Sequence, residues 1–441
     1  MRPADRTTKR VALVAALTGL LGAGLTFGAA RCAGAQGARA ADTGQRTAPA
    51  NPPGPGPGPG VAPPQQGGLG PVQVKLLMEV DYARGTDPRA QLPPYPSEGF
   101  GVRRMRVFLQ GTGPLGLGYR LHFDPTQLAS GPQGASPFRG VPLVEAYIDY
   151  AFPRDVLVRV GQQRVLFGLN STTGAPSLPT PEFAQFARSV QQRVSAFRDV
   201  GATVQGRLGA VEYSSGVFNG AGLNVLADND STRDFVGRVT YALVPGLQIG
   251  ASGWTGHAPR QYTRPGETRP VAPFLDNADF RRYGADLRYA RGPLLLTAEY
   301  ARNKAAFDSA AVTRPPGGVA LRQTGYNALA AVRLGALSPA LRRLEAVGRY
   351  DVWDPNGAVA DDEVTELVGG LNFYFAEIGA PPDKRLGRAL NYVQRESRFM
   401  LFLEHSRFAN AGTRPAPTPA APNPAPVQNN TRVHARWSLF Y

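Results

Sequence analysis

Runs of alternating apolar and polar residues recur from Val72 to the end of the chain. In PVQVKLLMEVDYARG, every second residue is apolar: Val74, Leu76, Met78, Val80 and Tyr82. The last ten residues, RVHARWSLFY, show the same period, with an apolar set of Val433, Ala435, Trp437, Leu439 and Tyr441. A period of two is typical of a β-strand that has one apolar face.

Sixteen such segments are predicted. Their expected spans are 72–83, 99–110, 115–124, 142–152, 155–164, 198–208, 210–219, 233–243, 246–256, 280–290, 293–303, 322–334, 341–352, 362–376, 391–407 and 430–441. Most are longer than the five or six residues typical of strands in soluble proteins and match the nine to eleven of a tilted membrane-spanning strand. The connections alternate between short turns and long segments, except that 377–390 is long where a short turn is expected.

This pattern predicts an all-β fold, a 16-stranded antiparallel transmembrane barrel with short periplasmic turns and long outer loops. The last strand must pair with the first, because an unpaired edge in lipid leaves backbone groups without partners. An aromatic residue at the end of the last strand is also similar to the C-terminal signal of outer-membrane proteins that the barrel-assembly machinery reads. In that signal the terminal residue is usually Phe, whereas here Phe440 precedes Tyr441.

The start of the chain predicts export. Residues 1–35 have a basic beginning, an apolar stretch and a small-residue cleavage site, as in a secretory signal peptide. A membrane anchor is the alternative interpretation of this segment. Residues 36–71 are rich in Pro and Gly and predict a disordered tether, and residues 72–441 form the predicted transmembrane β-barrel domain. Cleavage after Ala35 removes the only cysteine, Cys32.

The net charge by itself excludes few classes of function. The net charge is +15, and removal of residues 1–35 takes five basic and one acidic residue, leaving +11. No nucleotide-binding loop, nucleophile elbow or metal-like histidine spacing occurs. We therefore expect no catalytic site, no metal and no cofactor. Export and the strand pattern also argue against a nucleic-acid partner.

Several motifs resemble one family of outer-membrane porins. The motifs are the arginine-bearing stretch RVFLQGTGPLGLGYRLHFDP with Arg103 and Arg104 before it, the strand AYIDY, the segment GQQRVLFGL from Gly161, the strand start RDVG at Arg198, and YSSGVFNG from Tyr213. Together they are similar to the phosphate-selective porin O and P family, most closely between about residues 99 and 255. The resemblance implies a bacterial outer-membrane, passive, homotrimeric channel for small hydrophilic solutes or anions, whose third long loop folds into the lumen.

Arginines on that loop and on neighbouring strands are the candidate pore constriction and anion-binding site: Arg188, Arg193, Arg198, Arg104, Arg106 and Arg120. Guanidinium groups offer forked donors suited to phosphate or carboxylate. Strand parity places further charged residues in the lumen, among them Glu145, Arg349, Arg432 and Arg436. The alternative is that these are solvated, mutually paired charges and that the loop lies on the rim. Lysine, which accompanies arginine in phosphate-selecting members, is absent between Lys75 and Lys304, so phosphate preference stays open.

Two other functions remain compatible with the sequence. One is a non-conducting structural barrel in the outer membrane, with outer-membrane lipid as its surroundings. The other is a soluble, secreted β-rich binding protein.

Overall fold

The structure of the chain is a computed structural model. It describes residues 72–85, 98–128, 143–187, 197–225, 232–257, 278–307, 320–355, 357, 360–375, 397–409 and 429–440. The predicted signal peptide, the tether, the register around 376–392 and Tyr441 lie outside these residues. No helix in the described ranges is long and apolar enough to cross a membrane.

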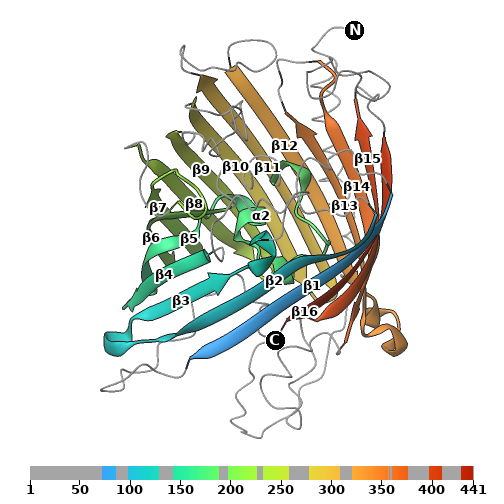
Figure 1. The fold of residues 1–441 in the computed structure, drawn as a ribbon, viewed down its shortest axis with the longest axis horizontal. Helices are drawn as coiled ribbons and strands as arrows, with labels where there is room; N and C mark the ends of the chain where they lie inside the picture. Colours follow the sequence, from blue (N-terminus) through green and yellow to red (C-terminus); the bar gives the residue numbers. More distant parts are fainter. Residues whose placement is uncertain are drawn as a thin grey trace, which may run out of the picture. The chain divides into compact units, whose positions relative to one another are not determined.

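The described residues form sixteen strands that close into one barrel, each strand antiparallel to its neighbours (Figure 1). The strands are β1 Gln73–Arg84, β2 Gly99–Thr112, β3 Gly118–Phe123, β4 Leu143–Phe152, β5 Val156–Arg164, β6 Arg198–Leu208, β7 Val211–Phe218, β8 Asp234–Val244, β9 Leu247–His257, β10 Ala278–Arg291, β11 Leu294–Phe307, β12 Ala320–Arg333, β13 Leu344–Asp354, β14 Val364–Tyr374, β15 Arg398–Phe408 and β16 Asn430–Phe440. The short helices are η1 Pro114–Gly116, η2 Pro125–Leu128, α2 Gly168–Thr172, η3 Ala175–Ser177, η5 Leu334–Ala336 and η6 Pro339–Leu341. The predicted fold class is confirmed.

The last strand closes the barrel against the first. Leu77 pairs with Phe440 and Arg84 with Val433, with six further pairs between them. A closed sheet has no free edge, so every strand has a hydrogen-bonding neighbour on both sides. This is the structural reason for the regular alternation that ends the sequence.

The two faces of the strands differ as the alternation predicts. On β1, Val74, Leu76 and Met78 are exposed on the outside, whereas Glu79 and Asp81 are buried inside. On β16, Val433, Trp437 and Leu439 are exposed and the alternate residues are buried. An apolar exterior and a charged interior are the arrangement expected of a barrel that faces lipid.

Four strands start at least two residues later than predicted. The strand expected over 362–376 spans Val364–Tyr374, and the strand expected over 391–407 begins, within the described residues, at Arg398. The other two follow 3₁₀ helices. The expected span 115–124 begins at Gly118, because Pro114–Gly116 forms η1 and Leu115 adopts a φ of 61°. The expected span 341–352 begins at Leu344, because Pro339–Leu341 forms η6. In both cases proline at the start of a tight helical turn displaces the strand boundary.

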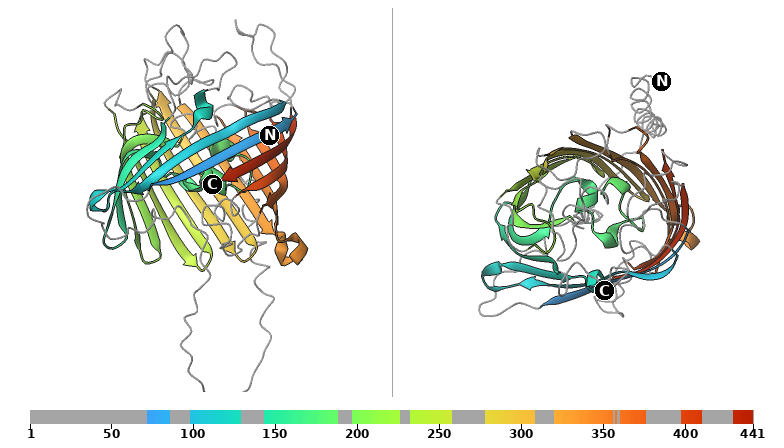
Figure 2. Two further views of the ribbon diagram at one scale, coloured as in Figure 1. Left: turned by 60° about the horizontal axis from the view of Figure 1, so that its bottom comes forward. Right: turned by 45° about the horizontal axis from the view of Figure 1, so that its top comes forward.

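The connection between β5 and β6 enters the barrel. Figure 2 shows α2 and the segment after it inside the ring of strands. We call residues 165–187 the L3 segment. Its apolar side chains form two clusters with the inner wall: Val165 and Phe167 pack with Trp254 and Phe280, and Phe183 and Phe186 pack with Trp353. The described part of the third long loop therefore folds inward, and the alternative position on the rim is wrong for these residues.

Candidate pore constriction

The L3 segment is hydrogen-bonded to the wall formed by β9, β10 and β11. The backbone N–H of Gly168 donates to the hydroxyl of Ser252 at 3.0 Å. The backbone N–H and the side-chain amide of Asn170 both donate to one carboxylate oxygen of Glu299, at 2.7 and 2.6 Å. A buried loop requires such partners, because its backbone groups no longer contact water.

A second set of contacts joins the L3 segment to β13, β14 and β15. Arg398 donates to the carbonyl of Leu178, and the amide of Asn372 donates to the carbonyl of Pro179 at 2.8 Å. The backbone N–H of Gln185 donates to Asp351 at 3.1 Å. Since the two sets of contacts lie on different parts of the wall, the segment crosses the lumen.

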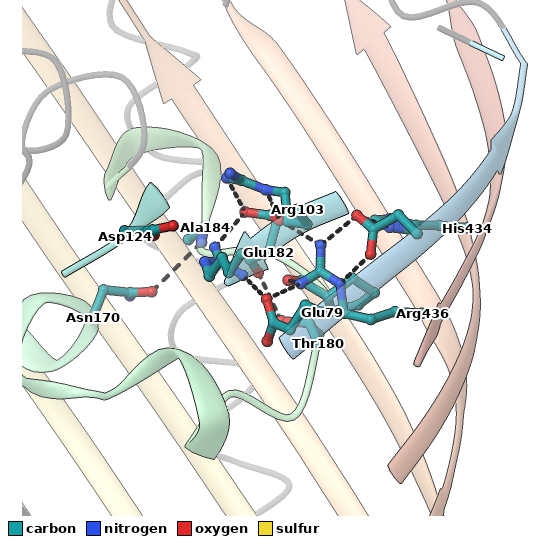
Figure 3. Close-up of polar contacts among 12 residues, drawn as sticks. Glu79, Arg103, Asp124, Asn170, Thr180, Glu182, Ala184, His434 and Arg436 are labelled. Atoms are coloured by element: carbon teal, nitrogen blue, oxygen red, sulfur yellow. Dashed lines mark hydrogen bonds and ion pairs between the residues drawn. The ribbon is translucent and has the colours of Figure 1, made fainter. Parts of the chain in front are cut away.

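Glu182 is the centre of the contacts made by the L3 segment. Its carboxylate accepts from Arg103 Nε at 2.8 Å, from Arg104 Nη2 at 3.2 Å and from Arg436 Nη2 at 2.7 Å. Figure 3 shows the side chains of Arg103 and Arg436 reaching Glu182 from different strands. One loop carboxylate thus connects β2 with β16.

Two wall carboxylates complete this group, which we call the Glu182 cluster. Arg104 pairs with Glu79, and Arg436 donates to both oxygens of Asp81 at 2.6 and 2.7 Å. The cluster holds three guanidinium groups and three carboxylates, so its formal charges balance. His434 extends it, with Nε2 at 3.0 Å from Asp81 and Nδ1 at 3.1 Å from Glu404.

A β-bulge explains why two consecutive arginines both reach Glu182. Glu79 pairs with Arg104 and Val80 with Val102, so Arg103 has no partner of its own in the ladder. An extra residue of this kind changes the direction in which the neighbouring side chains of the bulged strand point. Strand parity had placed Arg104 and Arg106 in the lumen, and the bulge adds Arg103.

The electrostatics of Glu182 follow from these contacts. Burial alone raises the pKa of a carboxyl group, but Arg103, Arg104 and Arg436 outweigh it and hold the pKa of Glu182 well below its usual value. Burial likewise opposes ionisation of Asp124, whose pKa is nevertheless lowered by Arg106 and by the hydroxyl of Thr126. Both carboxylates are therefore charged at neutral pH.

Three further predicted arginines, Arg106, Arg120 and Arg198, gather on the adjacent wall, formed by β2 to β6. Arg106 Nε lies 2.8 Å from Asp124, Arg120 Nε lies 3.2 Å from Glu145, and Arg198 Nη2 lies 3.0 Å from Glu145. Arg164 is the cross-strand partner of Arg198 and donates to the carbonyls of Ser171 and Thr173. Four guanidinium groups thus surround two carboxylates. The arginines are Arg106, Arg120, Arg164 and Arg198, and the acids are Asp124 and Glu145.

The structure brings together part of the predicted site. Arg104 joins the Glu182 cluster, whereas Arg106, Arg120 and Arg198 lie around Glu145 and Asp124. Arg188 and Arg193 lie outside the described residues. The sequence analysis includes Glu182 only as an acidic neighbour and does not include Arg164; the isolation of one acid on a long loop that carries several arginines was the available signal for Glu182. In the described residues, no three His, Cys, Asp or Glu side chains gather as metal ligands.

The closed barrel, its charged interior and the inward segment define a porin-type barrel. A profile of the family "Phosphate-selective porin O and P" matches residues 72–263, which confirms the resemblance read from the motifs. No curated protein sequence matches the chain.

Several solved structures share the fold. The anion-selective porin from Comamonas acidovorans has a TM-score of 0.53 at 15% identity, covering 83% of this chain and 99% of that chain. OmpT, an outer membrane protein of Vibrio cholerae solved in a trimer form, has a TM-score of 0.52 at 11% identity, with 83% and 99% covered. At these identities the similarity establishes the architecture of the barrel.

Proposed function

We propose that this protein is an outer-membrane porin, a water-filled channel for passive diffusion of small hydrophilic solutes, with a preference for anions. The observation that carries the proposal is a closed barrel with an apolar exterior and an arginine-bearing lumen narrowed by the L3 segment. The family profile and the anion-selective porin of similar fold support it.

The anion preference rests on the distribution of charge. The Glu182 cluster is balanced, whereas four guanidinium groups surround two carboxylates on the wall of β2 to β6. Unbalanced cations near a narrow section act on passing ions where water screens charge least. The proposed constriction comprises Arg104, Arg106, Arg120, Arg188, Arg193 and Arg198.

We also propose that the protein is exported through a cleaved signal peptide, is inserted by the barrel-assembly machinery and assembles into a homotrimer. Phosphate is proposed as one of several small anions that pass, because forked guanidinium donors bind phosphate and carboxylate alike.

Planar-bilayer recording tests the proposal directly. The purified barrel is expected to give discrete conductance steps, and its reversal potential in asymmetric KCl is expected to indicate anion preference. Replacing Arg188, Arg193 and Arg198 together by Gln should shift the reversal potential toward cations.

A charge-matched control separates a local effect from net charge. The short-turn control replaces Arg291, Arg333 and Arg343 by Gln, three exposed residues at the short-turn end of the barrel. It should leave the preference nearly unchanged. A folded barrel without conductance would instead identify a non-conducting structural barrel, and equal shifts in both variants would remove L3 from the constriction.

A further inference from the structure

A cluster of positive charge lies on the outer wall of the barrel, apart from the lumen. Lys304 on β11 lies directly opposite Arg281 on β10 and directly opposite Arg322 on β12. Arg302 lies one step away on β11, opposite Tyr283 and Thr324. All four basic residues are exposed and share the outward face, and the three strands run side by side (Figure 1). We call these four residues the outer basic cluster.

The arrangement is unfavourable without a counter-charge. Like charges directly opposite each other on adjacent strands destabilise a sheet. Within the described part of the chain, none of the four makes a hydrogen bond or an ion pair with a carboxylate. Asp279, the nearest acid on β10, is paired with His257 at 2.7 Å, and Asp354 on β13 lies opposite Thr324 rather than Arg322.

A row of tyrosines indicates how deep in the membrane the outer basic cluster lies. Tyr283 and Tyr300 point outward and are 53% and 42% exposed, and Tyr326 lies opposite Tyr300. Tyrosine on the outer face of a barrel is enriched where the hydrocarbon meets the headgroups. Arg281, Lys304 and Arg322 lie beyond this row, toward the long connections that follow β9 and β11. The outer basic cluster therefore lies at the level of the lipid headgroups.

We propose that the outer basic cluster binds a phosphate-bearing lipid headgroup of the surrounding leaflet. Arg281, Lys304 and Arg322 form a line across three strands, roughly 10 Å long at the usual strand spacing. A headgroup that carries more than one phosphate can contact all three cations. Phosphate accepts charge-assisted hydrogen bonds from guanidinium and ammonium groups, which relieves the repulsion between them. The proposal rests on the membrane location in the proposed function but not on conduction.

The test measures lipid binding by the full-length barrel in detergent, using native mass spectrometry with diphosphoryl lipid A as the probe. The triple variant Arg281→Gln, Lys304→Gln, Arg322→Gln is compared with the short-turn control. We expect roughly 100-fold weaker binding, because each basic residue near an anionic lipid contributes about five-fold. The short-turn control should bind like the parent, and a dephosphorylated lipid should bind weakly to all three.

Two further measurements make the result decisive. Heat-modifiable gel mobility shows whether each variant is folded. If the triple variant does not fold, the single variants Arg281→Gln and Arg322→Gln should each weaken lipid binding about five-fold. The conservative variant Lys304→Arg should retain lipid binding, because it keeps the positive charge. Equal lipid binding by the triple variant and the parent would overturn the proposal. So would equally tight binding of inorganic phosphate, which would indicate a free-ion site. Conductance of the triple variant should be unchanged, so a failure of the porin proposal would be seen separately.

Discussion

At the scale of single residues, one carboxylate controls the charge of the L3 segment. Glu182 is buried and accepts from three arginines of β2 and β16. Without it, the Glu182 cluster would keep three guanidinium groups against two carboxylates, Glu79 and Asp81. Breaking a buried charge pair costs more than forming it contributes, because the remaining partner stays desolvated.

Glu182→Gln is therefore expected to increase anion selectivity. A unit charge about 5 Å from a passing ion in water contributes roughly 0.8 kcal/mol, and screening by salt reduces it, so we expect about a two-fold rise in the anion-to-cation permeability ratio. The measurement is the reversal potential in asymmetric KCl. Glu212→Gln is the control, because Glu212 pairs with Arg207 at an exposed position. An unchanged ratio would place the Glu182 cluster away from the ion path.

The same variant defines the pH dependence of the parent. A carboxyl group with a lowered folded-state pKa contributes stability above its unfolded pKa of about 4.3 and loses it as the pH falls through the folded value. Since the pKa of Glu182 is held well below its usual range, its contacts should persist from pH 7 to pH 5. The difference in reversal potential between parent and variant is expected to stay constant over that interval.

At the scale of elements, the L3 segment is held by packing as well as by hydrogen bonds. Phe186 packs in a cluster with Phe183 and Trp353 on the inner wall. Gly325 on β12 lies beneath it, and a Cβ at this position would overlap the Cβ of Phe186. A side chain there cannot be accommodated unless the segment moves.

Gly325→Ala is expected to loosen the L3 segment while the barrel stays folded. Overpacking of this kind costs about 1–3 kcal/mol. Trypsin should then cleave after Arg188 or Arg193 about five-fold faster or more, because cleavage follows the population of the displaced loop. Gly348→Ala is the matched control, since Gly348 on the neighbouring strand has open space around its Cβ position. Equal cleavage rates in both variants would show that Phe186 does not hold the segment.

At the scale of the whole molecule, closure depends on the end of the chain. Phe440 is buried against Leu77, Phe108 and Ala175, and its backbone N–H donates to Ser397 at 3.0 Å. These contacts join the last strand to the first and to the L3 segment. Loss of the terminal residues would leave backbone groups of β1 without partners in lipid, at a cost of several kcal/mol each.

Removal of Phe440 and Tyr441 is expected to block barrel assembly. The loss of a buried Phe side chain alone costs about 3–5 kcal/mol. The measurement is the amount of heat-modifiable barrel in the outer membrane. Deletion of residues 40–70 serves as the control, because a Pro- and Gly-rich tether contributes no core, and it should leave assembly unchanged. Normal barrel levels after the terminal truncation would contradict the role of Phe440 in closure.

The sequence by itself determined the barrel. The two-residue period depends only on which face of a strand meets lipid, so it identified the strands and the inward charges of each, such as Asp81 and Arg436. Pairing of the last strand with the first also followed, because a lipid-facing sheet cannot have an edge. Predicted strand boundaries were displaced where proline starts a 3₁₀ turn, as before Gly118 and Leu344, and also in the strand expected over 391–407, which begins at Arg398 within the described residues.

Only the tertiary structure decided which charges meet. Glu182 and Arg436 are 254 residues apart in sequence, and no local pattern encodes that distance. The bulge that brings Arg103 to Glu182 depends on the register between two strands rather than on either strand alone. The two-residue period of the sequence determines which face of the barrel wall each side chain occupies. The partner of that side chain depends on the closure of the barrel and on the path of the L3 segment across the lumen.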